Sequence, residues 1–404
     1  MGNHQAPAIV LSLSINGLGV SRVLGRHGVP VIGVSRDATE PGLASRYVRT
    51  IWQYEGDDVK LVELLLRRAG EVANRPVLFP ITDGMVRALS ARREALLPHY
   101  RLALPPHHVV ERAMSKRGFA SLAEELDLPV PRTFHVHGAD EVRRVAGEVT
   151  YPCIIKPNWQ SPVGAGRGGL KTARADDADA LLAGYGSFSD AEPSAVIQEW
   201  IDGGDGDVHF CLQYYDRAGK PPASFCGRKI RQWPPLTGST ASCMPCPDEQ
   251  VETLTTRFFT ALDFRGLCSM EYKRGSRAGR LVMVEPTVGR TDWQSDVANA
   301  NGVPLPYVAY RDLTEAPIPT VRQRRRAVRW VRWSADAASA RHYRQQGSLT
   351  WPRWLWSVRP PIRWAVWSWR DPWPYLSGRL WAWKQRVRRL PGRLARPFRK
   401  QSAS

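Results

Sequence analysis

The sequence has little of what would mark a secreted or membrane-spanning protein. No stretch reaches the roughly 18 apolar residues of a membrane span. The first twenty residues contain no Lys or Arg, and Ser12, Ser14 and Asn16 interrupt their apolar run, which argues against a secretory signal. The six cysteines are scattered, and Cys243-Met-Pro-Cys246 has no second pair to complete a metal site. We therefore expect a cytoplasmic protein with reduced thiols.

Acidic residues are nearly absent from the last part of the chain. Residues 322–404 contain 21 of the 57 Lys and Arg but only two acids, Asp336 and Asp371, so they carry the whole net charge of +19. The other 36 basic residues are balanced by the other 36 of the 38 acids. The same segment holds 11 of the 16 tryptophans. This distribution predicts a neutral, enzyme-like body with a basic, Trp-rich extension.

The beginning of the chain alternates between predicted strands and helices. Residues 8–14 read as a buried strand, Asn16-Gly-Leu-Gly19 as a tight turn, and residues 29–34 as a second strand that follows a helix ending at His27. This order is typical of a Rossmann-like unit. Arg22 stands where the third glycine of a G-x-G-x-x-G fingerprint would be. We therefore interpret the turn as a helix start that binds no nucleotide.

The segment from Val149 to Gly169 is the most informative part of the chain. A short apolar run ends on Lys156, and a glycine loop begins seven residues later. Its four glycines are Gly164, Gly166, Gly168 and Gly169. A lysine at a strand end provides a fixed cation, and glycines let backbone N–H groups approach an anion because no Cβ intervenes. The pattern predicts a triphosphate site, and so an enzyme that uses ATP.

A second candidate element is Ile197-Gln-Glu-Trp-Ile201, which an acidic turn follows at residues 202–207. An extended segment offers backbone N–H and C=O groups to a purine edge. An acid directly after it can accept hydrogen bonds from ribose hydroxyls. The same pattern is also that of a surface strand with an acidic turn, and the sequence leaves both interpretations open.

A predicted hairpin carries the candidate metal ligands. Two apolar segments, Cys268–Lys273 and Leu281–Pro286, flank a turn. A hairpin centred on residue 278 places Glu271 opposite Glu285, with Cβ atoms about 4.5–5.5 Å apart. Two carboxylates so close repel each other unless a cation lies between them or one is protonated. Oxygen ligands near a triphosphate indicate Mg²⁺; a register shift would instead put the two on different faces.

Cationic residues near the hairpin are candidates for catalysis. Arg290 follows the second metal strand, where a fixed guanidinium can stabilise charge on a transferring phosphoryl group. The cluster Arg228-Lys229-Ile-Arg231 lies on a separate predicted strand. Arg228 and Lys229 can hold a carboxylate substrate, because basic side chains pair with carboxylates. A solvated charged face explains the cluster equally well.

In this order, these elements resemble the ATP-grasp superfamily of carboxylate–amine ligases over roughly residues 1–315. Met114-Ser-Lys116 is similar to the lysine that opens the family's ATP-grasp domain, and the glycine loop to its mobile phosphate loop. The resemblance implies three metal ligands, Glu271, Glu285 and Thr287. It implies that the nucleotide is held by Lys116, Lys156, Gly164, Gly166, Gly168, Gly169, Gln198, Glu199, Trp200, Ile201 and Asp207.

The resemblance also implies a fold and a reaction. The fold is α/β (α+β), with a Rossmann-like pre-ATP-grasp domain at 1–110, a two-lobed ATP-grasp domain at 111–320, and the extension at 321–404. ATP, with Mg²⁺ or Mn²⁺, would phosphorylate a small-molecule carboxylate, and an amine or a thiol would attack the acylphosphate. The family commonly has asparagine where this chain has Thr287. Threonine is a poorer Mg²⁺ ligand, so a degenerate nucleotide-binding scaffold remains an alternative.

The extension interleaves tryptophan with arginine. Tryptophan prefers the membrane interface and arginine attracts anionic headgroups, so residues 322–404 predict contact with an anionic membrane surface. A basic end over residues 386–400 would add to that attraction. Nucleic-acid binding also uses arginine and aromatics. The excess of Trp over Tyr and Phe favours the membrane, and with it a role in cell-envelope or exopolysaccharide modification. The sequence makes no prediction of oligomeric state.

Overall fold

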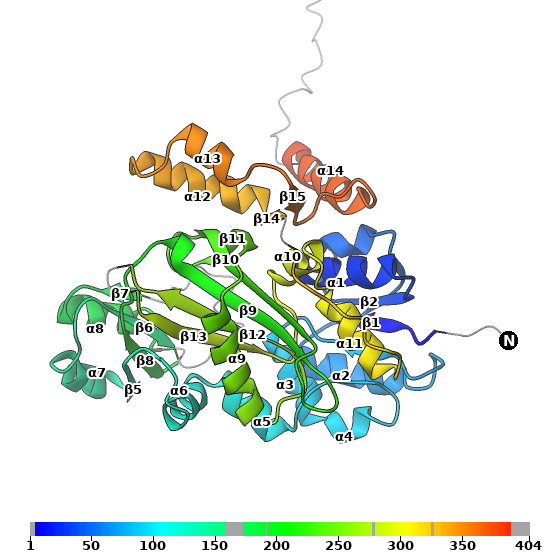
Figure 1. Ribbon diagram of the computed structural model, residues 1–404, viewed down its shortest axis with the longest axis horizontal. Helices are drawn as coiled ribbons and strands as arrows, with labels where there is room; N and C mark the ends of the chain where they lie inside the picture. The colour runs from blue at the N-terminus through cyan, green and yellow to red at the C-terminus, as the bar shows by residue number, and fades with distance from the viewer. Residues whose placement is uncertain (1–4, 158–172, 191, 277–278, 325–326, 389–404) are drawn as a thin grey trace, which may run out of the picture.

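The computed structural model describes most of the chain. The described residues are 5–157, 173–190, 192–276, 279–324 and 327–388, with the backbone alone given for 384–388. They form three sheets with helices around them, and a C-terminal layer lies along one side, at the top of Figure 1. The glycine loop at 163–169, which carries four predicted phosphate-binding residues, lies outside the described residues.

A parallel four-stranded sheet opens the chain, in the order β3-β2-β1-β4. Its strands are β1 (Ala8–Val10), β2 (Val31–Ser35), β3 (Val48–Gln53) and β4 (Val77–Phe79). The helical segments around it are α1 (Ile15–Arg26), η1 (Pro41–Ala44), α2 (Asp58–Arg67), α3 (Asp83–Ala91) and α4 (Arg93–Leu96). All residues of β1 and β4 are buried, as expected of strands covered on both faces. The predicted Rossmann-like architecture is confirmed.

The predicted turn at Asn16-Gly-Leu-Gly19 is wrong. The helix α1 begins at Ile15, so these four residues form its first turns. A Cβ atom on Gly17 would lie 1.8 Å from the carbonyl oxygen of Ser12. Glycine is needed here because the helix start approaches the end of the preceding strand, and not because a turn reverses the chain.

A small antiparallel sheet follows, in the order β5-β8-β6-β7. Its strands are β5 (Thr133–His137), β6 (Cys153–Pro157), β7 (Ala173–Ala175) and β8 (Ser194–Glu199). The helices of this region are α5 (His107–Met114), α6 (Lys116–Glu125), α7 (Ala139–Ala146) and α8 (Ala178–Gly186). The helices α7 and α8 share one apolar core with the sheet, in which Ile155 and Ile197 are fully buried. Lys156 lies near the end of its strand, as predicted.

The largest sheet has seven strands, in the order β13-β12-β9-β10-β11-β14-β15. The first five in this order are β13 (Leu281–Val288), β12 (Gly266–Arg274), β9 (Val208–Tyr215), β10 (Ala223–Trp233) and β11 (Ser239–Pro245). The associated helical segments are η3 (Asp205–Asp207), α9 (Glu249–Ala261), α10 (Ser295–Ala300) and α11 (Leu305–Leu313).

The two faces of this sheet pack against different partners. On β9, Phe210, Leu212 and Tyr214 join the core shared with the N-terminal sheet. Cys211 and Tyr215, which alternate with them, join a second core with residues of α6 and α9. Successive side chains of β9 are therefore directed alternately toward the N-terminal region and toward α9, and the same alternation on neighbouring strands decides which residues share the candidate site.

The C-terminal segment continues the large sheet. Its elements are β14 (Arg329–Val331), α12 (Trp333–Gln345), α13 (Trp351–Ser357), β15 (Ile362–Trp364) and α14 (Trp373–Arg388). β14 pairs with β11, and β15 pairs with β14. Trp330 and Trp354 are buried, so part of the Trp-rich extension packs on the body. Within the described residues, no helix combines the length and apolarity needed to cross a membrane.

Candidate functional site

The two predicted metal carboxylates face each other across the β12–β13 hairpin. Glu271 pairs with Glu285 in the strand register, as predicted. A β-bulge directly after this pair places Val284 outside the ladder, so that Tyr272 pairs with Met283. Tyr272 and Met283 join the core beneath α9. The bulge thus lets the two carboxylates share the opposite face, toward the N-terminal region.

Glu285 is accessible to solvent yet crowded by protein. Desolvation raises the pKa of its carboxyl group, whereas the ammonium groups of Lys156 and Lys116 act in the opposite direction. The net shift is upward. A bound divalent cation would offset this penalty, because its positive charge favours the ionised carboxylate.

Glu271 belongs to a buried polar network. Its Oε2 accepts a hydrogen bond from Nζ of Lys229 at 2.9 Å, and its Oε1 accepts one from Nε2 of Gln294 at 2.8 Å. Gln294 also donates to the hydroxyl of Thr240. The Lys229 side chain is only 5% exposed, whereas Glu271 retains 24%. Each carboxylate oxygen keeps a second lone pair, so these bonds leave Glu271 able to bind a further cation.

Two lysines from the small-sheet region approach Glu285. Nζ of Lys156 donates to Oε1 of Gln198 at 3.0 Å, and Nζ of Lys116 donates to the carbonyl oxygen of Pro157 at 2.6 Å. Burial lowers the pKa of both lysines, and in each the Glu285 charge opposes that shift. An anion bound here would lie between two ammonium groups, those of Lys116 and Lys156, and the paired carboxylates of Glu271 and Glu285.

The predicted nucleotide segment ends the strand β8. Glu199 forms an ion pair with Arg280 at 2.8 Å, and the ring of Trp200 lies beneath the guanidinium of Arg174 at 4.9 Å. Ile201 follows in irregular backbone. Gln198 is the one member whose side chain contacts Lys156. The side chains of Glu199 and Trp200 therefore already have partners, which leaves backbone groups as the natural contacts for a purine.

Asp207, the predicted ribose-binding acid, ends the short η3 helix. Its Oδ2 accepts a hydrogen bond from the backbone N–H of Gly204 at 2.7 Å. Nζ of Lys273 donates to the carbonyl oxygens of Gly203 and Gly204, which fixes the same turn to β12. Asp207 is half-buried and keeps further lone pairs for a ligand.

Arg290 is held by the N-terminal region. Its Nε donates to Oδ1 of Asp83 at 2.6 Å, and the guanidinium also contacts the carbonyl oxygen of Thr291. Burial lowers the pKa of Arg290, but the Asp83 carboxylate outweighs it and the net shift is upward. Gly289 precedes it at φ +70°, and a Cβ there would lie 2.3 Å from Leu104. The backbone thus approaches the N-terminal region as closely as glycine allows.

The structure separates Arg228 from Lys229. Neighbouring residues of a strand point to opposite faces, so Lys229 reaches Glu271 while Arg228 lies on the α9 side with His209. Arg231 is buried against Asp336 of α12. The interpretation of this cluster as a solvated face is wrong, because Lys229 and Arg231 are each 4% exposed. Lys229 alone belongs to the carboxylate site.

Thr287 lies two residues beyond Glu285 and opposite Ser269, so both hydroxyls are directed to the face of the carboxylates. Ser269 donates to Asp292 at 2.8 Å. Burial raises the pKa of Asp292. These groups supply oxygen atoms only, which suits a hard cation such as Mg²⁺. Among the described residues no group of three or more His, Cys, Asp or Glu side chains is arranged to hold a metal. Phosphates and water would therefore have to complete the coordination.

Several site residues were not predicted from the sequence. Ser269 has a detectable signal, since it stands two residues before Glu271 and strand alternation places both on one face. Asp83 and Gln294 have none, because Asp83 is 207 residues from its partner Arg290 and Gln294 lies in a loop. Chain folding alone brings these groups to the hairpin.

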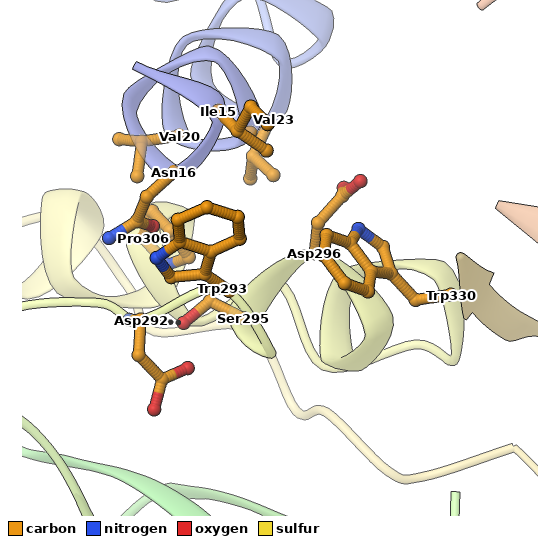
Figure 2. A pocket seen from close by; sticks show the side chains of 11 residues that line it. Ile15, Asn16, Val20, Val23, Asp292, Trp293, Ser295, Asp296, Pro306 and Trp330 are labelled. Carbon is orange, nitrogen blue, oxygen red and sulfur yellow. Dashed lines mark hydrogen bonds between the residues drawn. The ribbon is translucent and has the colours of Figure 1, made fainter. Parts of the chain in front are cut away.

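A small pocket lies beside this network, between α1 and the segment 292–296 (Figure 2). Two of its polar side chains illustrate how the lining is already engaged by protein groups. Asn16 exchanges two hydrogen bonds with Thr291, and Asp296 accepts from Arg363. The pocket joins the N-terminal helix to the large sheet, and we assign it no ligand.

Comparisons with known proteins bear on the fold. No protein-family model matches the chain. The D-aspartate ligase of Enterococcus faecium is 23% identical over 308 residues, which cover 70% of this chain and 71% of that protein. The carbamoyl phosphate synthase large chain of Thermus thermophilus is 23% identical over 227 residues, covering 52% of this chain but only 20% of that much longer protein.

Solved structures match a larger share of the chain. An N5-carboxyaminoimidazole ribonucleotide synthetase in its ADP complex has a TM-score of 0.63 and 12% identity, covering 81% of this chain and 82% of that one. The biotin carboxylase domain of the Hydrogenobacter thermophilus 2-oxoglutarate carboxylase, solved with MgADP and bicarbonate, has a TM-score of 0.63 and 15% identity, covering 79% and 73%. The chain has the fold of the ATP-grasp ligases, as its motifs indicated.

Proposed function

We propose that the chain is an ATP-dependent carboxylate–amine ligase, or carboxylate–thiol ligase, that acts through an acylphosphate. The observation that carries the proposal is the opposed pair Glu271 and Glu285, with Lys116 and Lys156 beside it on an ATP-grasp fold. Paired carboxylates and convergent lysines suit a metal-bound triphosphate. The relative named D-aspartate ligase adds support for joining a carboxylate to an amine.

In the proposed reaction, a carboxylate oxygen of the substrate attacks the γ-phosphorus of ATP, the bond to the β-phosphate oxygen breaks, and ADP leaves. An amine nitrogen then attacks the acyl carbon, inorganic phosphate leaves, and the nitrogen loses a proton to solvent. Glu271 and Glu285, with Thr287, would hold Mg²⁺ or Mn²⁺, which when bound neutralises phosphate charge. Lys116 and Lys156 hold the phosphates in position.

Two further cations have roles in this proposal. Arg290, fixed by Asp83, stabilises the charge that develops on the transferring phosphoryl group. Lys229, which is next to Glu271, is placed to pair with the substrate carboxylate. Arg228 is left out, since it lies on the other face of the sheet. Gln198, Glu199, Trp200, Ile201 and Asp207 would receive the adenine and ribose.

The second candidate function is a nucleotide-binding scaffold without turnover. Thr287 favours it, because a hydroxyl binds Mg²⁺ less well than an amide oxygen. ADP release separates the two candidates, measured with ATP, Mg²⁺ and pairs drawn from amino acids of both configurations and from sugar acids. The ligase sustains ADP release over many turnovers only when both an acid and an amine are present, because without the amine the acylphosphate is not consumed. Nucleotide binding without ADP release for any pair would favour the scaffold.

We further propose that the protein works at the cytoplasmic face of a membrane, on a component of the cell envelope or of an exopolysaccharide. The support is the composition of the extension, which holds 11 tryptophans and a surplus of 19 positive charges. Fractionation of cells that make the protein tests this location. Recovery with the membranes at low salt supports it, and recovery only in the soluble fraction contradicts it.

A further inference from the structure

Exposed large apolar side chains are concentrated in the C-terminal segment. Among the described residues, ten large hydrophobic side chains are at least half exposed, and only Val59 lies outside the segment 333–383. The other nine are Trp333, Trp351, Leu355, Trp356, Trp369, Trp373, Leu380, Trp381 and Trp383. Figure 1 shows α13 and α14 along one side of the molecule. So many exposed large apolar side chains in one segment are unusual for an ordinary protein surface.

The helix α14 presents an apolar stripe to solvent. Trp373, Leu376, Leu380 and Trp383 follow one another at intervals of three, four and three residues, so they share one side of the helix. All four are exposed. Among the described side chains of this helix, Pro374 is the buried one. The stripe is therefore free to meet a partner without any change in the fold.

Buried ion pairs fix this layer to the body. Asp371, at the start of α14, forms an ion pair with Arg22 of α1 at 2.9 Å, and both side chains are at most 1% exposed. Asp336 of α12 forms a second buried pair with Arg231 of β10 at 2.8 Å, with side chains 0% and 5% exposed. The layer is consequently a fixed part of the enzyme surface.

These two pairs also determine the charge of the surface. Asp336 and Asp371 are the only acids among residues 322–404, and both are buried. Every charge that the extension exposes is therefore positive. The guanidinium of Arg344 lies 3.7 Å from the ring centre of Trp351, and that of Arg359 lies 3.6 Å from the ring centre of Trp356. Such pairs present an aromatic ring and a cation together.

We propose that the exposed side of α13 and α14, which we name the docking face, binds the surface of a bilayer that contains anionic phospholipids. Tryptophan rings suit the headgroup level, and the arginines suit lipid phosphates. Exposed Leu355, Leu376 and Leu380 add apolar area that acyl chains can cover but that bases cannot stack on. A second copy of the chain would bring positive charge against positive charge.

This assignment gives the proposed membrane location a definite surface and orientation. The docking face rests on the ligase proposal only for its biological purpose, which is to hold the enzyme at the membrane. Lipid binding itself can be measured without turnover. A Glu285→Gln variant separates the two, since it leaves the docking face intact. If that variant binds vesicles like the wild type, failure of the ligase assay says nothing against the docking face.

The test is sedimentation of the full-length protein with vesicles of phosphatidylcholine alone or with about 30% phosphatidylglycerol. We expect at least about tenfold stronger partitioning to the anionic vesicles. The variant Trp373→Ala/Leu376→Ala/Leu380→Ala/Trp383→Ala should lose about tenfold or more, because four exposed anchors are removed. The matched control Ile51→Ala/Val59→Ala/Leu66→Ala removes exposed apolar groups from the N-terminal region and should change partitioning less than about twofold.

Four results would overturn the assignment. They are no binding of the wild type to anionic vesicles, equal binding of the fourfold variant, sedimentation without vesicles that the variant abolishes, or tight duplex DNA or RNA binding that the variant loses. The third result would make the face a self-association surface, and the fourth would make it a nucleic-acid site. The single variant Leu380→Glu, which puts a carboxylate at an exposed position in the stripe, should weaken vesicle binding even if the fourfold variant folds poorly.

Discussion

At the scale of single residues, Glu285 shows how a site group is both costly and useful. Burial raises its pKa, so the folded chain holds this proton more tightly than the unfolded chain does. The contribution of the group to the free energy of unfolding therefore falls as pH rises from the ordinary glutamate value through the raised one. Metal binding needs the charged form, and the ammonium groups of Lys156 and Lys116 favour that form.

The variant Glu285→Gln should separate activity from stability. We expect ADP release to fall by about 100-fold or more, because a metal ligand is lost. The melting temperature at pH 7 should not fall, since the substitution removes a carboxylate whose desolvation by the surrounding protein is unfavourable. In the wild type, the affinity for Mg²⁺-nucleotide should weaken as the pH drops through a value above the usual glutamate pKa. The variant should not show this dependence of affinity on pH. A marked loss of thermal stability in the variant would contradict the account.

The pair Lys229–Glu271 gives a second prediction at this scale. Lys229→Met removes the ion pair and leaves Gln294 as the hydrogen-bond donor to Glu271. This change should lower the free energy of unfolding by about 2–4 kcal/mol, because the carboxylate loses its counter-ion. Addition of MgADP should restore more stability to this variant than to the wild type, because a cation then replaces the lost ammonium. Urea unfolding with and without MgADP measures both effects. Lys60→Met, on an exposed lysine, is the control; similar behaviour of the two variants would refute the prediction.

At the scale of elements, the first turn of α14 is fixed by one carboxylate. Asp371 accepts hydrogen bonds from Arg22, from the hydroxyl of Ser45 and from the backbone N–H of Arg46. This links α14 to α1 and to the end of η1. Without that acid, a buried arginine would lose its charged partner.

Asp371→Asn should therefore destabilise the protein by about 3–5 kcal/mol, because Arg22 is left buried without a counter-ion. Chemical denaturation measures the change. The control Asp140→Asn removes an acid that is 98% exposed in its pair with Arg143, and should change stability by less than about 0.5 kcal/mol. A loss below about 1 kcal/mol for Asp371→Asn would show that the pair does not fix the layer.

Elements were predictable where local signals are strong. The β12–β13 hairpin and its Glu271–Glu285 pair were predicted from two apolar runs joined by a short connection. The bulge beside that pair was not predicted, and it shifts the three pairs next to the turn by one residue. The strands β14 and β15 were not predicted. Each has three residues in an Arg- and Trp-rich segment and forms only because β11 offers an edge to β14, which in turn pairs with β15. Three residues are too few to show an alternation of polar and apolar side chains, and nothing in them indicates the distant strand with which they pair.

At the scale of the whole molecule, the candidate site is assembled from three regions. The large sheet supplies Glu271 and Glu285, the small-sheet region supplies Lys116 and Lys156, and the N-terminal region supplies Asp83. The residue types that carry the chemistry could be read from the sequence, because their motifs are local. The sequence does not show which of these residues come together in the folded chain, as the separation of Arg228 from Lys229 illustrates. The extension adds a surface on a different side from α4 and α5 (Figure 1).

The central claim is that a substrate carboxylate is phosphorylated by ATP before an amine attacks it. The most direct measurement uses carboxylic acids labelled with oxygen-18, supplied with ATP, Mg²⁺ and an amine, and determines the mass of the phosphate released. We expect amine-dependent release of phosphate that carries one labelled oxygen, because the carboxylate oxygen leaves with the phosphoryl group. Phosphate that carries no label, released whether or not the acid is present, would contradict it.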